Sequence, residues 1–273
     1  MSYRTQEVKR IAHLSDLHFG AIDDNNIVKA LIDSIRSIQA DLIVVSGDLT
    51  QRAKPKQFIQ ASIFCSSFDV PVLITPGNHD LEPWWFPYRR QVNSYKTFTK
   101  YYGYPEENLL KIGNCLIARV ITNQPLAFQK GTFSTTQAKE LIEKLGDNNC
   151  EELIIVTHHP LTLKYSESNK SCVIPEILVD WMCRHPRVTL LSGHTHIQEA
   201  QILRRRGENV CLRSIAGTAT SYRWRGESGS GNQYAVLEFQ NNGIVVETYS
   251  YSADRRSFND NDRAFYNLSR VKG

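Results

Sequence analysis

The chain has 273 residues, of which 41% are hydrophobic and 22% are charged, with 32 Lys and Arg against 28 Asp and Glu. These values are typical of a soluble globular protein and exclude disordered, collagen-like and disulfide-scaffold classes. The formal net charge of +4 is too small for a protein that coats nucleic acid, so we expect no stable nucleic-acid partner.

The N-terminus and the cysteines predict the compartment. Residues 1–10 are polar and charged, without an apolar run before a small-residue cleavage site. No segment approaches the roughly 18 uninterrupted apolar residues that a membrane span requires. The six cysteines are scattered singly, which favours reduced packing residues over zinc knuckles or disulfides. We therefore expect a cytoplasmic protein.

Residues 8–80 alternate between short apolar runs and amphipathic stretches. The apolar runs predict buried strands at 8–14, 42–45 and 70–74. Apolar side chains that recur every three or four residues predict helices over 27–38 and around 58–64. Strands that alternate with helices indicate a parallel sheet covered on both faces, with functional groups on the loops at the carboxyl ends of its strands.

Residues 81–104 fit neither pattern, and we interpret them as an insertion that ends in a helix near 94–102. Their first part, 81–90, combines aromatic and basic side chains, and three roles stay open for it. It could be a packed insertion, a wall that stacks a nucleobase, or a lip that rests on a membrane as a peripheral contact. As a wall, Trp84 and Trp85 would bind substrate.

The second half resumes the alternation and then changes character. Strands are predicted at 108–120, 153–156 and 188–191, with helices at 135–145 and 175–184. After His196 the pattern becomes hairpin-like, which predicts antiparallel strands over about 198–251 and a second sheet that faces the first. Because no linker or internal repeat is visible, we predict a single domain over residues 1–273.

Four polar clusters each follow a predicted strand, and six of the eight histidines lie in them. The clusters are Asp16-Leu17-His18, Gly47-Asp48, Gly77-Asn78-His79-Asp80, and His158-His159 together with Gly193-His194-Thr195-His196. Carboxylate, imidazole and amide groups together suit Mn, Fe or Zn, whereas calcium prefers oxygen alone. The candidate metal ligands are Asp16, His18, Asp48, Asn78, His158, His194 and His196.

Seven ligands fit two divalent ions better than one, because an ion that keeps a position open for water seldom uses more than four protein side chains. Asp48 is the natural bridge, since a carboxylate offers two oxygens. Two ions about 3.5–4 Å apart are the standard apparatus of phosphoester hydrolysis. The catalytic candidates are His79, placed to reach the leaving group, and Asp80, expected to orient its imidazole. The glycines at 47, 77 and 193 are expected to turn the chain sharply at the strand ends.

The ordered set Asp16-x-His18, Gly47-Asp48, Gly77-Asn78-His79-Asp80, His158 and Gly193-His194-x-His196 resembles that of the calcineurin-like metallophosphoesterases. The resemblance implies an α/β fold, a four-layer α/β/β/α sandwich with two facing mixed β-sheets, and a di-metal centre. It assigns Asp16, His18, Asp48 and His196 to the first metal, and Asp48, Asn78, His158 and His194 to the second. The family's ligand two residues before Pro160 selects His158 over His159. Residues 11–20 and 216–220 are similar to a bacterial branch that includes class III cyclic-nucleotide phosphodiesterases.

The sequence thus predicts a dinuclear metallophosphoesterase that hydrolyses small phosphodiesters such as cyclic nucleotides by attack of a metal-bridging hydroxide. Arg223 and Arg225 are candidates to grip the substrate phosphate. One alternative is a lipid A pathway hydrolase similar to UDP-diacylglucosamine pyrophosphatases, whose aromatic lip would meet a membrane. A nuclease is disfavoured by the mild net charge, and a catalytically silent binding module by the presence of every predicted ligand. The sequence carries no signal for the oligomeric state.

Overall fold

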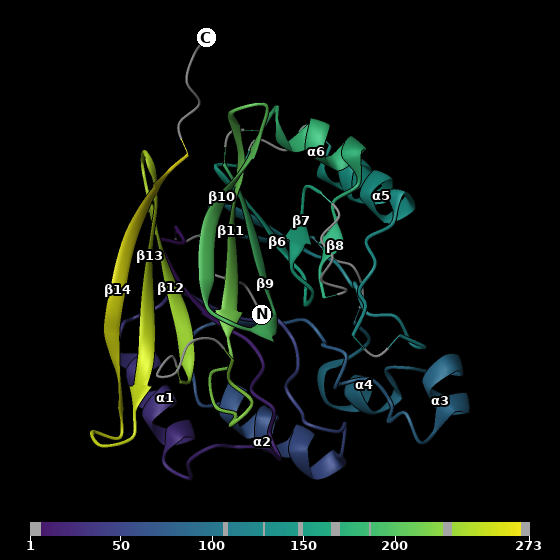
Figure 1. The fold of residues 1–273 in the computed structure, drawn as a ribbon, viewed down its shortest axis with the longest axis vertical. Helices are drawn as coiled ribbons and strands as arrows, with labels where there is room; N and C mark the ends of the chain where they lie inside the picture. Colours follow the sequence, from purple (N-terminus) through teal and green to yellow (C-terminus); the bar gives the residue numbers. More distant parts are fainter. Residues whose placement is uncertain are drawn as a thin grey trace.

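The structure is a computed structural model that describes residues 7–105, 109–127, 129–146, 150–164, 170–185, 187–225 and 231–268. Two six-stranded mixed sheets face each other, and helices cover their outer faces (Figure 1). This arrangement confirms the expected four-layer α/β/β/α sandwich.

The first sheet has the strand order β14-β13-β12-β1-β2-β3. Its strands are β1 (Arg10–Leu14), β2 (Leu42–Val45), β3 (Val72–Ile74), β12 (Gln233–Gln240), β13 (Gly243–Ser252) and β14 (Ser257–Asn267). The pairs among β1, β2 and β3 are parallel, and the remaining pairs are antiparallel. The crossover helices are α1 (Ile27–Ser37) and α2 (Pro55–Cys65).

The second sheet has the strand order β10-β11-β9-β6-β5-β4. Its strands are β4 (Leu109–Ile112), β5 (Cys115–Arg119), β6 (Glu152–Val156), β9 (Val188–His196), β10 (Glu199–Arg205) and β11 (Glu208–Gly217). The helices α5 (Thr135–Leu145) and α6 (Glu176–Met182) cover it, and a small ribbon is formed by β7 (Leu161–Thr162) and β8 (Cys172–Val173). Helix α5 begins at a capping box, in which the Ser134 hydroxyl accepts the backbone N–H of Gln137.

Side-chain alternation along the strands explains the four layers. In β2, Ile43 and Val45 belong to a core shared with α1 and α2, whereas Leu42 and Val44 belong to a central core shared with the second sheet. Strand β6 divides its side chains in the same way between the central core and a core under α5 and α6. Successive strand residues point to opposite faces, so strands that are apolar throughout can support a core on each side.

Parts of the predicted tracing are wrong. The segment expected as one strand at 108–120 is the hairpin of β4 and β5, because Gly113, at φ +57°, turns the chain between them. The C-terminal strands do not form a sheet of their own. Instead β12, β13 and β14 extend the first sheet from β1, while β10 and β11 extend the second. Strand pairing also continues beyond residue 251, through β14.

The insertion at 81–104 contains two short helices, α3 (Pro87–Val92) and α4 (Lys96–Tyr102). Helix α4 packs against α2, and its Phe98 is buried in the core under the first sheet. Helix α3 lies at the outer edge of the molecule (Figure 1). Among the described residues, none of the helices has both the length and the apolar character needed to cross a lipid bilayer.

Candidate metal centre

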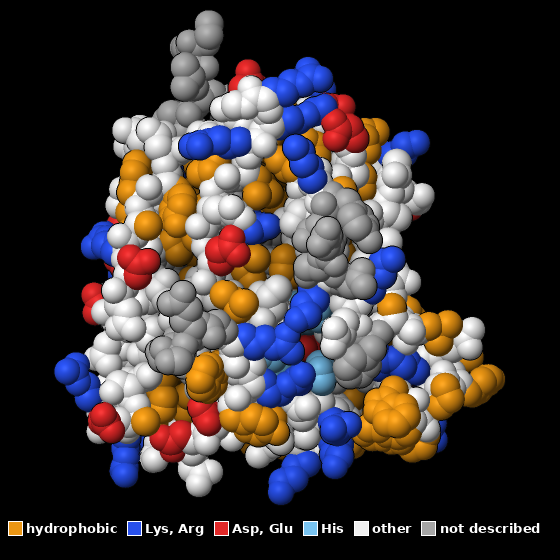
Figure 2. All heavy atoms as spheres, viewed as in Figure 1, with side chains coloured by type: hydrophobic (Ala, Val, Ile, Leu, Met, Phe, Trp, Pro, Cys, Tyr) orange, Lys and Arg blue, Asp and Glu red, His pale blue; other side chains and the backbone are white. Residues whose placement is uncertain are grey.

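The seven predicted ligands are all buried and lie where strands of the two facing sheets end. Asp16 and His18 follow β1, Asp48 follows β2, Asn78 follows β3 and His158 follows β6. His194 and His196 occupy the end of β9. In the space-filling view, histidine side chains are visible in a hollow beneath Lys and Arg side chains (Figure 2). The topology therefore brings together residues that are up to 180 positions apart, from Asp16 to His196.

One cluster consists of Asp16, His18, Asp48 and His196, with one ligand atom of each within 4.8 Å of the others. Nε2 of His18 lies 3.2 Å from Nε2 of His196. Oδ1 of Asp16 lies 3.1 Å from Nε2 of His196 and 3.6 Å from Nε2 of His18. Metal–ligand bonds of about 2.0–2.2 Å place neighbouring ligand atoms about 3–3.5 Å apart. The spacing of this cluster thus fits one divalent cation.

A second cluster gathers around His158. Its Nε2 lies 3.5 Å from Oδ1 of Asp48, 3.1 Å from Oδ1 of Asn78 and 3.2 Å from Nδ1 of His194. The other carboxylate oxygen of Asp48, Oδ2, lies 3.7 Å from Nε2 of His18 in the first cluster. Asp48 therefore contacts both clusters, with one oxygen directed to each.

The hydrogen bonds around the clusters leave nitrogen lone pairs directed inward. Nδ1 of His158 lies 2.9 Å from the Ser46 carbonyl, and Nδ1 of His196 lies 2.6 Å from the Arg223 carbonyl. A ring that donates its Nδ1–H to a carbonyl presents an unprotonated Nε2, as metal-binding histidines do. Oδ1 of Asp16 is buried and accepts no hydrogen bond within the described ranges. A buried carboxylate oxygen without a donor is costly unless a cation faces it, so the donor set fits a metal.

Charges within the clusters reinforce this arrangement. Burial alone would raise the pKa of Asp16, but His196 and His18 hold that pKa well below its ordinary value. Although burial opposes it, Asp16 raises the pKa of His196. Burial and the neighbouring His158 lower the pKa of His194 to about 3. The site therefore combines ionised carboxylates with a neutral imidazole, which are the forms that bind cations.

Five of the predicted ligands have left-handed backbone conformations, which non-glycine residues rarely adopt. They are Asp16 (φ 52°), His18 (φ 46°), Asp48 (φ 53°), His194 (φ 70°) and His196 (φ 61°). Each costs on the order of 1–2 kcal/mol. Such strain is concentrated at functional sites, where the surrounding structure imposes it. No pattern in the sequence predicted these left-handed conformations.

The three glycines beside the ligands have two different roles. Gly47, at φ +102°, turns the chain as expected. Gly77 and Gly193 have no such φ and instead leave room for the ligands. A Cβ at Gly77 would overlap the Asp48 carboxylate, and one at Gly193 would overlap Ser15 and the Asp16 carboxylate. The expectation of a sharp turn is wrong for Gly193, which lies within β9, whereas a turn does begin at Gly77, whose carbonyl accepts the Asp80 N–H at 3.2 Å.

We expect Gly193→Ala to weaken metal binding and to lower turnover by about tenfold or more, because displacement of a positioned group by about 1 Å can cost 100-fold. Gly217→Ala is the matched control. It lies on the neighbouring strand, paired with His196, and a Cβ there meets nothing closer than 3.5 Å. The measurement is activity against added Mn²⁺ for both variants. Equal metal dependence of the two would contradict this role of Gly193.

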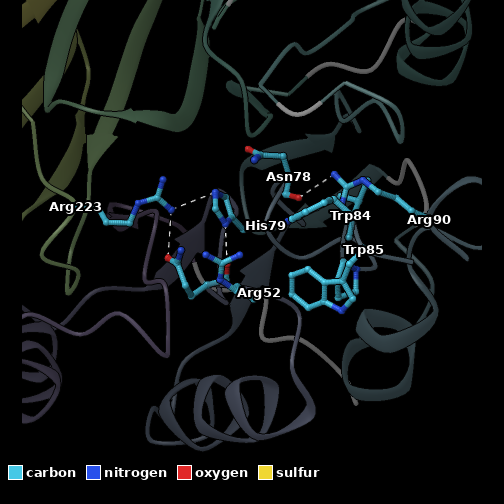
Figure 3. Close-up of a pocket in the computed structure, with 10 residues that line it drawn as sticks. Arg52, Asn78, His79, Trp84, Trp85, Arg90 and Arg223 are labelled. Carbon is cyan, nitrogen blue, oxygen red and sulfur yellow. Dashed lines mark hydrogen bonds between the residues drawn. The ribbon is translucent and has the colours of Figure 1, made fainter. Parts of the chain in front are cut away.

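His79 lies beside both clusters. Its Nδ1 is 2.7 Å from the Gln51 carbonyl, and its Nε2 is 3.1 Å from Nη1 of Arg223 (Figure 3). Its backbone N–H donates to Oδ1 of Asp48 at 2.8 Å. Burial lowers the pKa of His79 to about 4. The ring is therefore neutral near pH 7, with Nδ1–H given to Gln51 and Nε2 accepting from Arg223.

Asp80 has a different role from the one predicted. Its carboxylate accepts the backbone N–H groups of Leu49, Thr50 and Gly77 at 2.8–3.0 Å, and the Thr50 hydroxyl at 2.9 Å. Burial and the nearby Asp48 raise the pKa of Asp80 to about 7. Because Gln51 and Arg223 occupy the ring nitrogens of His79, the expectation that Asp80 orients this ring is wrong. Asp80 instead ties the loop that carries Asp48 to the loop that carries Asn78.

The predicted substrate residues divide between two adjoining hollows. Arg223 and Arg225 line the opening over the clusters, together with Gln129 and Lys170. Trp84 and Trp85 line a recess of about 160 Å³ that also contains His79, Arg223 and Arg52 (Figure 3). Sequence reasoning missed Gln129 and Lys170, because each is a single polar residue in a loop without a motif.

Arg90, a buried residue of α3, was also missed. Its guanidinium donates to the carbonyls of Pro125 and Glu82, each at 2.6 Å, and to the carbonyl of Asn78 at 3.4 Å. These bonds anchor the insertion to the backbone of a predicted ligand. A buried arginine among basic surface residues has no distinguishing sequence signal.

Comparisons with known proteins agree with this geometry. A model of the calcineurin-like phosphoesterase family matches residues 9–198. A probable cyclic nucleotide phosphodiesterase of Vesicomyosocius okutanii is 23% identical over 253 residues, which cover 87% of this chain and 97% of the relative. The 3',5'-cyclic adenosine monophosphate phosphodiesterase CpdA of Escherichia coli K12 is 26% identical over 200 residues, which cover 68% of this chain and 69% of the relative.

A similar fold is found in purple acid phosphatase PPD1 from yellow lupin seeds, with a TM-score of 0.65 and 15% identity. The match covers 94% of this chain and 54% of the plant protein, and it bears on the fold alone. The family model, by contrast, spans well over half of the chain and includes every cluster residue through His196. The chain therefore belongs to the calcineurin-like phosphoesterase family and is a phosphoric ester hydrolase.

Proposed function

We propose that this chain is a dinuclear metal-dependent phosphodiesterase that acts on small phosphodiesters such as cyclic nucleotides. The observation that carries the proposal is Asp48, whose Oδ2 faces His18 at 3.7 Å and whose Oδ1 faces His158 at 3.5 Å. A carboxylate directed to two ligand clusters suits a bridge between two ions. Asp16, His18 and His196 would complete one ion's ligand set, and Asn78, His158 and His194 the other's.

The chain's own residues would bind and orient the ester. Two divalent ions, when bound, would supply positive charge that polarises the phosphoryl group and lowers the pKa of water. Arg223 and Arg225 line the opening, where guanidinium groups can hold phosphate oxygens. His79 lies next to Arg223, within reach of an oxygen on that side of the phosphate.

The substrate class is supported by the relatives and by size. Two relatives are named cyclic nucleotide phosphodiesterases. The recess beside His79, about 160 Å³, is smaller than the roughly 300–1,000 Å³ of sites that enclose drug-sized ligands. A small recess suits a small ester, and the net charge of +4 disfavours a nuclease. A cytoplasmic location stays a prediction.

The test is hydrolysis of bis-p-nitrophenyl phosphate with Mn²⁺, Fe²⁺ or Zn²⁺, followed by a panel of cyclic nucleotides, glycerophosphodiesters and nucleotide sugars. We expect turnover with at least one of these ions and a preference for phosphodiesters in the panel. Absence of hydrolysis with every ion would overturn the proposal in favour of a binding module.

Metal removal should also lower stability. A ligand present at 100 times its Kd stabilises the folded state by about 2.7 kcal/mol, which corresponds to a Tm change of roughly 5 °C in a domain of this size. We therefore expect a chelator to lower the Tm by at least about 5 °C, and added Mn²⁺ to restore it. Thermal unfolding with and without chelator is the measurement. An unchanged Tm would contradict tight metal binding by the folded state.

A further inference from the structure

The recess beside the metal clusters is lined partly by aromatic side chains, which phosphate binding does not require. Trp84 and Trp85, whose ring centroids are 5.9 Å apart at 81°, line the recess together with the buried Leu81. The Arg52 guanidinium lies 5.9 Å from the centroid of the Trp85 ring. In Figure 3, Trp84 and Trp85 lie on one side of the recess, and His79 and Arg223 on the other. We call the recess lined by Trp84, Trp85, Arg52, His79 and Arg223 the aromatic recess.

The aromatic recess is built on a fixed frame. Arg90 joins the insertion to the Asn78 backbone, as described above. Glu82 is buried, its N–H donates to the Ser94 carbonyl at 2.7 Å, and its Oε1 accepts the Thr97 N–H at 3.0 Å. The segment that carries the two tryptophans is therefore held at both ends. A preformed wall binds a ligand without first having to order itself.

The exposure of the tryptophans points to a ligand. Trp84 is 61% exposed and Trp85 is 40% exposed, although both border a site where water-excluding contacts are useful. An indole face and an adjacent guanidinium together bind planar aromatic groups, through stacking and cation–π attraction. The volume of about 160 Å³ is sufficient for one ring system.

The aromatic recess also has a defined relation to the reacting phosphate. Gln51, whose carbonyl holds Nδ1 of His79, directly precedes Arg52. Asn78, a predicted ligand, and Arg223 line the same recess. A ring bound there would lie on the His79 side of a phosphate held at the clusters.

We propose that the aromatic recess binds the planar aromatic part of a phosphodiester, such as a nucleobase, and so selects esters that carry one over aliphatic esters. The inference rests on the proposed function, because it names the substrate class of that same site. Trp85 and Arg52 would be the specificity-determining residues.

The experiment compares cyclic AMP with glycerophosphoethanolamine, an aliphatic phosphodiester, in wild type, Trp85→Ala and Trp85→Phe. Loss of one base-stacking contact predicts a kcat/KM for cyclic AMP that is about tenfold to 100-fold lower in Trp85→Ala, mostly through KM. Glycerophosphoethanolamine should be unaffected, and Trp85→Phe should restore most of the loss. Tyr88→Ala is the matched control, since Tyr88 is a 77% exposed aromatic residue of α3 that does not line the recess. Equal losses for both esters, or none for cyclic AMP, would overturn the proposal.

A second measurement separates this inference from the proposed function. In the presence of a chelator, adenosine monophosphate should quench tryptophan fluorescence, glycerol phosphate should not, and Trp85→Ala should lose most of the quenching. Quenching without hydrolysis of any ester would support nucleotide binding in the aromatic recess and refute the proposed function. Quenching that is unchanged in Trp85→Ala would overturn the proposal that the aromatic recess binds the nucleobase. So would a response to phosphatidylglycerol vesicles without a response to the nucleotide, which would indicate a membrane contact instead.

Discussion

Asp48→Asn is expected to lower phosphodiesterase turnover by about 1,000-fold or more, since metal charge contributes several kcal/mol to the transition state and each 1.36 kcal/mol is tenfold. Asp48 has an oxygen 3.5 Å from Nε2 of His158 and the other 3.7 Å from Nε2 of His18. An amide of the same shape has one acceptor oxygen and one N–H donor group. The amide side chain could therefore serve one cluster and would repel a cation at the other.

The fold should survive this change. Asp48 has a φ of 53°, a conformation that asparagine tolerates as well as aspartate does. Asp41→Asn is the matched control, because Asp41 precedes the same strand, β2, at its opposite end and accepts only the backbone N–H groups of Lys9 and Arg10 among its described hydrogen bonds. Turnover with bis-p-nitrophenyl phosphate and the bound metal per chain are measured together. Wild-type turnover in Asp48→Asn would refute the bridging role.

His79→Gln should retain the metal and lower turnover by about 100-fold to 10,000-fold, the usual contribution of a positioned acid or base. His79 contacts the clusters through its backbone N–H, which donates to Asp48, and the substitution keeps that bond. The ring itself is held between Gln51 and Arg223, at 2.7 and 3.1 Å, and packs edge-on against the His18 ring with centroids 4.9 Å apart, without occupying a ligand atom. Its removal should therefore affect the ester and not the ions.

A comparison of two esters with different leaving groups tests the role of His79 more specifically. A p-nitrophenolate ion departs without a proton, whereas an alkoxide needs one. His79, which is neutral in this structure, could supply it only after its Nε2 takes up the proton that the attacking water loses, so the loss in His79→Gln should be larger for an alkyl phosphodiester than for the nitrophenyl ester. His185→Gln is the control, since His185 stacks on Trp181 with ring centroids 3.4 Å apart at the end of α6. Loss of bound metal in His79→Gln would show that His79 is a ligand. Equal losses for both esters would exclude help to the leaving group.

The clustering of the predicted ligands could be expected from the sequence because the position of each depends on a local relation. Asp16, Asp48 and His158 lie two or three residues beyond strands that are mostly apolar and buried, and the carboxyl ends of neighbouring parallel strands meet at one edge of a sheet. That rule needs no knowledge of distant pairing. Helix α5 also depends on local sequence: it begins and ends where predicted, at 135 and 145, and Ser134 caps its first turn.

Features that depend on distant contacts could not be predicted. Hairpin patterns identified the C-terminal strands, but the assignment of β12 to β1 rests on pairing between residues more than 200 positions apart. Asp80 is adjacent to His79 in the sequence, yet its carboxylate bonds to backbone groups of Leu49 and Thr50 on another loop. The left-handed φ values of five predicted ligands likewise arise from the packed site and not from local preference.

Titration of the metal-free protein with Mn²⁺, with bound metal and turnover of bis-p-nitrophenyl phosphate followed on the same samples, tests the dinuclear centre most directly. The arrangement of the two clusters around Asp48 predicts two ions per chain, with full activity only after the second ion binds. Saturation of activity by a single ion per chain, or undiminished turnover in the presence of a chelator, would contradict it.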